Sequence, residues 1–116
     1  MIRIVIKRNG THIEEVRVSG HGGGRKGSDI VCAAVSAVMQ TALAGLLHYL
    51  KVNIYHKMRK GRISIRIPPE LSGHDLEVSQ IILSTMLIGL RHIASQYPEK
   101  VRIYSNGKLT KPDALE

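Results

Sequence analysis

The stretch Val18–Ser36, VSGHGGGRKGSDIVCAAVS, joins the end of an expected strand to the start of an expected helix. Its middle part, Gly20 to Ser28, is rich in glycine and carries two cations, so a regular element there would cost much backbone entropy. We therefore expect a loop. The only cysteine of the chain, Cys32, follows just past the junction with the helix, and His21 lies at the start of the loop.

The segment before this loop predicts a β-hairpin. Isoleucines alternate with other residues along its first strand, at Ile2, Ile4 and Ile6. Asn9-Gly10 favours a type I′ turn between the two strands. The alternation changes parity in the second strand, and a bulge near Glu14-Glu15 would absorb that change.

The segment after the loop, Asp29 to about Leu50, predicts a helix whose N-cap is Ser28 or Asp29. Apolar residues occur nearly all round it, at Val31, Val35, Val38, Leu43, Leu46, Leu47 and Leu50. That pattern favours a buried helix. A membrane span is the alternative for about twenty residues of this kind. Polar residues such as Ser36, Gln40 and His48 argue against it, so we expect no membrane contact.

The rest of the chain predicts two more strands, a second helix and a last strand. The two strands flank Arg59-Lys60-Gly61, the helix runs from about Gly73 to Gln96, and the last strand lies within residues 100–107. The expected order is ββαββαβ. It predicts an α+β single-domain sandwich with a mixed or antiparallel sheet covered by two helices. We expect the domain to occupy residues 1–107 and a loose tail to occupy residues 108–116.

Composition narrows the class of protein. The 116 residues suit one domain, and one cysteine cannot form an internal disulfide. With no pattern of a secretory leader, we expect a cytoplasmic protein. The formal net charge of +8 favours an anionic partner such as RNA or the ribosome, and a merely solvated basic surface is the alternative. The histidines show no metal-ligand spacing, so we expect no metal and no cofactor.

Cys32 lies in the first turn of the predicted helix, and this position suggests a nucleophile. Free backbone N–H groups and the helix dipole stabilise an anion there, which would lower the pKa of the thiol. His21 could activate the thiol or pair with its thiolate. The alternative is that Cys32 is a small buried hydrophobic residue and that His21 is an ordinary polar residue at a strand end.

Two neighbours of Cys32 have candidate auxiliary roles. Asp29 could orient His21, although a helix cap is the favoured role. Ser36 lies one turn after Cys32, where its hydroxyl could donate to the substrate or the thiolate, or bond back to the carbonyl of Cys32. Backbone N–H groups at the helix start, that of Cys32 included, would form an oxyanion hole.

The loop glycines suggest how a peptide would enter. Gly20 and Gly22 leave the backbone bare beside His21, and Gly27 is a candidate hinge. We expect the loop from Gly20 to Ser28 to be mobile without substrate and to order over a bound peptide.

The residues Ser19-Gly20-His21, followed by GSDIVCAAVSAV at residues 27–38, together resemble the ribosomal-processing cysteine protease family, Prp. The resemblance extends to the order of elements and the length of the chain. It implies a homodimeric cysteine endopeptidase that removes an N-terminal extension from a large-subunit ribosomal protein of bacteria. It also implies that Cys32 is the nucleophile and His21 the general base. A non-catalytic RNA-binding or ribosome-associated module is the alternative from charge alone.

Overall fold

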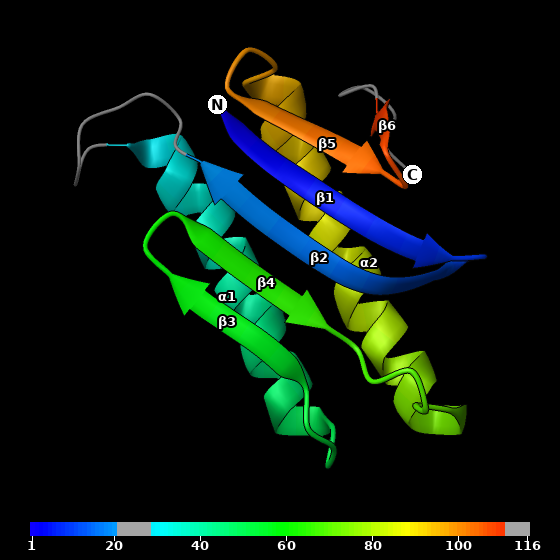
Figure 1. The fold of residues 1–116 in the computed structure, drawn as a ribbon. Helices are drawn as coiled ribbons and strands as arrows, with labels where there is room; N and C mark the ends of the chain where they lie inside the picture. Colours follow the sequence, from blue (N-terminus) through cyan, green and yellow to red (C-terminus); the bar gives the residue numbers. More distant parts are fainter. Residues whose placement is uncertain (21–28, 111–116) are drawn as a thin grey trace.

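The computed structural model describes residues 1–20 and 29–110, and in it one mixed sheet carries two helices on a single face (Figure 1). The elements are β1 (Ile2–Asn9), β2 (His12–Gly20), α1 (Ile30–Tyr49), β3 (Tyr55–Arg59), β4 (Arg62–Arg66), α2 (Gly73–Gln96), β5 (Val101–Ser105) and β6 (Lys108–Thr110). The strand order is β3-β4-β2-β1-β5-β6. Only the β1–β5 pair of this sheet is parallel. The predicted α+β sandwich with a mixed sheet is confirmed.

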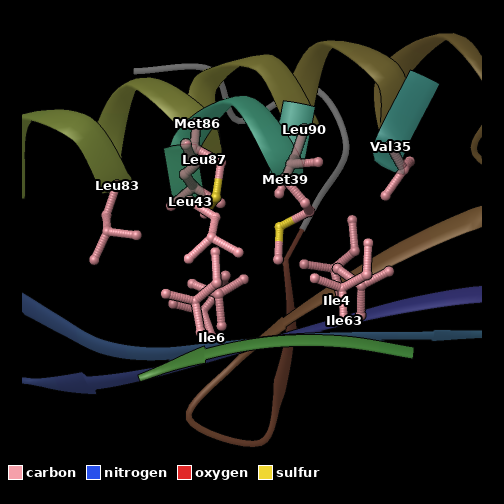
Figure 2. Packing of buried hydrophobic residues seen from close by; sticks show 14 of the residues in the cluster. Ile4, Ile6, Val35, Met39, Leu43, Ile63, Leu83, Met86, Leu87 and Leu90 are labelled. Carbon is pink, nitrogen blue, oxygen red and sulfur yellow. The ribbon is translucent and has the colours of Figure 1, made fainter. Parts of the chain in front are cut away.

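The core fills the space between the sheet and the helices (Figure 2). Ile4 and Ile6 of β1 point into this core, because successive side chains of a strand point to opposite faces of a sheet. From above, α1 adds Met39 and Leu43, and α2 adds Leu90. The side chains that fill this space are aliphatic or sulfur-containing, as the near absence of aromatic residues requires.

Helix α1 is buried on one face, which corrects the expectation that it is buried all round. Val35 and Leu46 are buried, whereas Val38 is only partly buried and Leu47 is 48% exposed. Both helices are long and apolar enough to cross a membrane by length and composition. Each nevertheless packs a buried stripe into the core between the helices and the sheet, as helices of a folded α+β domain do.

The β1–β2 hairpin contains the predicted bulge. Lys7 pairs with Glu15 and Arg8 pairs with Ile13, which leaves Glu14 as the extra residue. The side-chain amide of Gln80 on α2 supports the bulge, because its Oε1 accepts from the N–H of Ile13 at 2.7 Å and its Nε2 donates to the carbonyl of Ile13 at 3.0 Å.

The turn of this hairpin differs from the predicted type I′ turn at Asn9-Gly10. Asn9 pairs with His12, so the two loop residues are Gly10 and Thr11. Gly10 has a φ of +61°, and Thr11 is not among the residues with positive φ. A type I′ turn requires positive φ at both central residues, and a glycine at the first position alone matches the requirement of type II′.

A sixth strand replaces the start of the predicted tail. Asn106 and Gly107 have φ values of +48° and +82°, and they connect β5 to β6 as a type I′ turn does. The side chain of Asn106 also accepts a hydrogen bond from the N–H of Arg8 at 2.9 Å, which ties this turn to β1. Lys108–Thr110 is therefore part of the sheet, and residues 111–116 lie outside the described residues.

Gly20 ends β2 in a conformation that suits no other residue. Its φ is +95°, and a Cβ at this position would lie 2.1 Å from the carbonyl oxygen of Met1. Its N–H donates to the carbonyl of Gly61 at 3.1 Å, so the end of β2 is held against the β3–β4 turn. The backbone before His21 is thus positioned from two sides.

We predict that Gly20→Ala destabilises the fold more than Gly10→Ala does. Both glycines have positive φ, which costs an alanine about 1–2 kcal/mol, but only Gly20 also meets backbone at contact distance. The free energy of unfolding, measured by urea denaturation, should fall further for Gly20→Ala. Equal losses for the two variants would contradict the close approach to Met1.

Candidate active site

Cys32 is the third residue of α1, and Asp29 is the N-cap of that helix. The Asp29 carboxylate accepts from the N–H of Cys32 at 2.9 Å, and the carbonyl of Asp29 accepts from the N–H of Ala33 at 3.0 Å. An aspartate in this position satisfies donors that the first turn leaves without helical partners. The favoured role of Asp29 as a cap is therefore confirmed.

The surroundings of Cys32 disfavour its thiolate. Burial raises the pKa of the Cys32 thiol above its ordinary value, and the nearby Asp29 carboxylate raises that pKa further. Both effects oppose the lowered pKa that we predicted from the helix start. Burial first removes the thiolate from water. The cap is also an anion, so the end of the helix that would attract a thiolate presents a negative charge to it.

The same cap removes one of the expected donors of the predicted oxyanion hole. The N–H of Cys32 already donates to Asp29, so it is engaged by the cap rather than directed at a substrate oxygen. Of the predicted alternatives for Ser36, the bond back to the carbonyl of Cys32 is not formed within the described residues. Oγ of Ser36 instead accepts from Nε2 of Gln40 at 2.8 Å.

A cavity of about 340 Å³ lies beside Cys32. It is lined by Gly20, Cys32 and Ser36 together with residues of β1, β2, α1 and the β3–β4 hairpin: Ile2, Val18, Val35, Gln40, Met58, Arg59, Lys60, Gly61, Arg62 and Ile63. The chain thus brings the end of β2 and the start of α1 to one concave site. A cavity lined by apolar side chains and a few polar groups is the usual form of a binding site.

Sequence reasoning missed the β3–β4 hairpin as part of this site. Met58, Arg59 and Arg62 reach the cavity because β4 pairs with β2, and that pairing carries the hairpin next to Gly20. The basic run 59–62 was visible in the sequence, but nothing local connects it to a cysteine 27 or more positions earlier.

The structure tests only part of the predicted site. Gly20, Cys32 and Ser36 line one cavity, and Asp29 adjoins Cys32. His21, Gly22 and Gly27 lie outside the described residues. The expectation of a loop that orders over a bound peptide lies outside them as well, so it stays a prediction.

Solved structures share this fold. The chain is similar to the essential ribosomal processing protease Prp from S. aureus in complex with a covalently linked product peptide, with 29% identity over 91% of this chain and 100% of that one and a TM-score of 0.79. The same S. aureus protease with a substrate peptide has a TM-score of 0.76 at 28% identity, again over 91% of this chain and 100% of that one. A Streptococcus mutans protein has a TM-score of 0.77 at 28% identity, over 90% of this chain and 93% of that one.

The sequence agrees with these structural likenesses. No curated protein matches the chain at the significance required. The family model of cysteine protease Prp, by contrast, matches residues 1–102, which include every described element from β1 to α2 and the candidate site. A match of this extent establishes the class of enzyme, and the chain belongs to the cysteine protease Prp family.

Proposed function

We propose that this cysteine protease is an endopeptidase that removes an N-terminal extension from a large-subunit ribosomal protein in the cytoplasm, with Cys32 as nucleophile and His21 as general base. The observation that carries the proposal is that Cys32 lines a cavity together with Gly20, the residue directly before His21. The similar S. aureus enzyme, named a ribosomal processing protease, supports the substrate class, and its covalently linked peptide supports covalent chemistry.

The reaction is acyl transfer in two steps. Sγ of Cys32 attacks the peptide carbonyl, the C–N bond breaks, and His21 gives a proton to the leaving amine. Water then attacks the thioester, with His21 taking its proton, and the carboxylate product leaves with the thiol restored. Because burial and Asp29 raise the pKa of Cys32, its thiol is largely protonated at neutral pH. His21 therefore acts first as the base that takes the thiol proton during attack.

The cavity suggests how a peptide would be held. Val18, Val35 and Met58 offer it an apolar wall, which would receive an apolar side chain next to the cleaved bond. Ser36 lines the same cavity, and its hydroxyl would contact the peptide backbone. No cofactor takes part in this mechanism.

We predict that Cys32→Ala abolishes cleavage of a peptide that spans the N-terminal extension of the ribosomal protein, because no nucleophile remains. His21→Gln should lower kcat about 10²–10⁴-fold, the usual contribution of a positioned general base. His74→Gln, an exposed histidine at the start of α2, is the matched control and should leave kcat unchanged. Mass spectrometry of the products measures both rate and cut site. Undiminished cleavage by Cys32→Ala would overturn the proposal.

We predict that Asp29→Asn lowers the pKa of Cys32. The amide oxygen of asparagine can still cap α1, whereas the negative charge that raises the thiol pKa is gone. The rate of iodoacetamide alkylation against pH should therefore have its midpoint at lower pH in Asp29→Asn than in the wild type. An unchanged midpoint, or one at higher pH, would contradict the electrostatic role of Asp29.

We also propose that the enzyme is a homodimer, formed through the surface of α1 and α2 that faces away from the sheet. A groove of about 530 Å³ lies there between the helices, and its lining residues carry no charge. Gly45 and Gly89 keep the groove open, and Ile81 at its edge is 59% exposed. An uncharged groove on an exposed helix pair favours contact with a second copy of the same surface.

We predict a dimer at micromolar concentration in sedimentation equilibrium, and a monomer after Ile81→Glu. Leu109→Glu on β6 is the control, because Leu109 is about equally exposed, at 57%, but belongs to the edge strand β6 and does not line the groove. A wild-type protein that stays monomeric at all concentrations would exclude this interface.

A further inference from the structure

The face of the sheet turned away from the helices is uncovered by any element of the described chain (Figure 1). The alternation that buries Ile2 and Ile4 leaves Arg3 on this open face, and the one that buries Val16 and Val18 leaves Arg17 there. Both arginines are exposed. One pattern in the sequence therefore creates an aliphatic core on one side of the sheet and a basic surface on the other.

Strand pairing places arginines of distant segments in one row across this open face. Arg59 of β3 pairs with Arg62 of β4, which pairs with Ser19 of β2. Ser19 pairs with Arg3 of β1, which pairs with Arg102 of β5. The row crosses five strands, or about 19 Å at the usual strand spacing of about 4.8 Å.

A depression of about 580 Å³ lies on the same face beside this row. Four cations line it, Arg17, Lys57, Arg59 and Arg62. Serine hydroxyls from β2 and β4 add hydrogen-bond donors between the charges. Such a surface offers both charge and donors to phosphate oxygens.

The positive charge of this face outweighs its negative charge. Among the paired residues of the described strands, Glu15 is the one acidic residue on the face, and it forms an ion pair with Arg17 at 3.7 Å. The bulge residue Glu14 lines a cavity with Lys7 and Arg66, away from the arginine row. Arg59 lies directly opposite Arg62, and Arg3 directly opposite Arg102. Like charges opposite each other in a sheet are destabilising. An anionic partner would remove that repulsion.

We propose that the open basic face binds the phosphate backbone of RNA. The choice of RNA over other polyanions rests on the proposed function, since a ribosomal protein substrate brings the enzyme close to ribosomal RNA.

The open basic face would bind RNA through charge rather than base stacking. The two tyrosines of the face are occupied by cations, with Arg66 over Tyr55 at 4.6 Å and Arg3 over Tyr104 at 6.0 Å. Contacts limited to phosphates position a protein on RNA without reading its sequence.

The basic face continues into the candidate active site. Arg59 and Arg62 line both the depression on the open face and the cavity beside Cys32. RNA bound on the open face would therefore run past the entrance of the cavity. This arrangement would raise the local concentration of a substrate that is itself bound to RNA, because the two sites share one edge of the sheet.

The test compares two triple variants that remove the same charge. The open-face variant removes three positive charges from the open face, by Arg3→Gln, Arg17→Gln and Lys57→Gln. None of these three residues lines the cavity of Cys32. The control variant removes three positive charges from elsewhere, by Lys51→Gln, Lys100→Gln and Lys108→Gln. Lys51 and Lys100 lie in loops, and the strand register places Lys108 on the other face of the sheet. Binding of a mixed-sequence single-stranded RNA is followed by fluorescence anisotropy over a series of salt concentrations.

We predict that the open-face variant binds the RNA at least tenfold more weakly than the wild type at 0.1 M salt. The slope of log K against log salt should lose about 2 in magnitude, since each phosphate contact to a single strand contributes about 0.7. The control variant should change affinity less than threefold. Both variants should stay folded, with a single cooperative melting transition, and should cleave an isolated peptide at the wild-type rate.

Three outcomes would overturn the proposal: no salt-dependent RNA binding by the wild type, equal loss in both variants, or binding to anionic lipid vesicles or to polyglutamate in preference to RNA. Failure here is separable from failure of the proposed function. RNA binding by Cys32→Ala protein does not depend on cleavage, and peptide cleavage by the open-face variant does not depend on RNA.

Discussion

Burial of one face of the sheet beneath two aliphatic helices is the constraint on which the rest of the structure depends. Once Ile4, Ile6 and their neighbours face the helices, a shift of one residue in strand register would exchange the core for the basic face. The bulge at Glu14 keeps β2 in phase with this requirement, and Gln80 supplies the hydrogen bonds that the bulged backbone needs. The register in turn carries Gly20, Cys32 and the β3–β4 hairpin to one cavity.

Asp29 has two opposite effects on Cys32. As an N-cap it satisfies the first turn of α1 and so holds Cys32 in position. As an anion it raises the pKa of the same cysteine. Burial acts on this pKa in the same direction, so the surroundings hold Cys32 in its thiol form. In the mechanism that we propose, His21 would therefore have to remove the thiol proton during attack.

The two-layer architecture leaves two surfaces of opposite chemistry. The groove on the outer side of α1 and α2 is lined by uncharged residues, whereas the open face of the sheet is basic. The candidate active site lies where the start of α1 meets the sheet, next to the basic face. A dimer formed through the helices would therefore leave both the site and the basic face accessible.

Local patterns in the sequence determined the alternating strands, the bulge, both helices and the placement of Cys32 in the first turn, because each depends on periodicity or capping over a few residues. The family resemblance rested on two such local segments. Tertiary structure decided the rest. The turn at Gly10-Thr11 follows from strand register, and β6 forms because Asn106-Gly107 is tied to β1. The raised thiol pKa and the part played by Met58 and Arg59 in the cavity depend on burial, charge and strand pairing between distant segments, which no local pattern records.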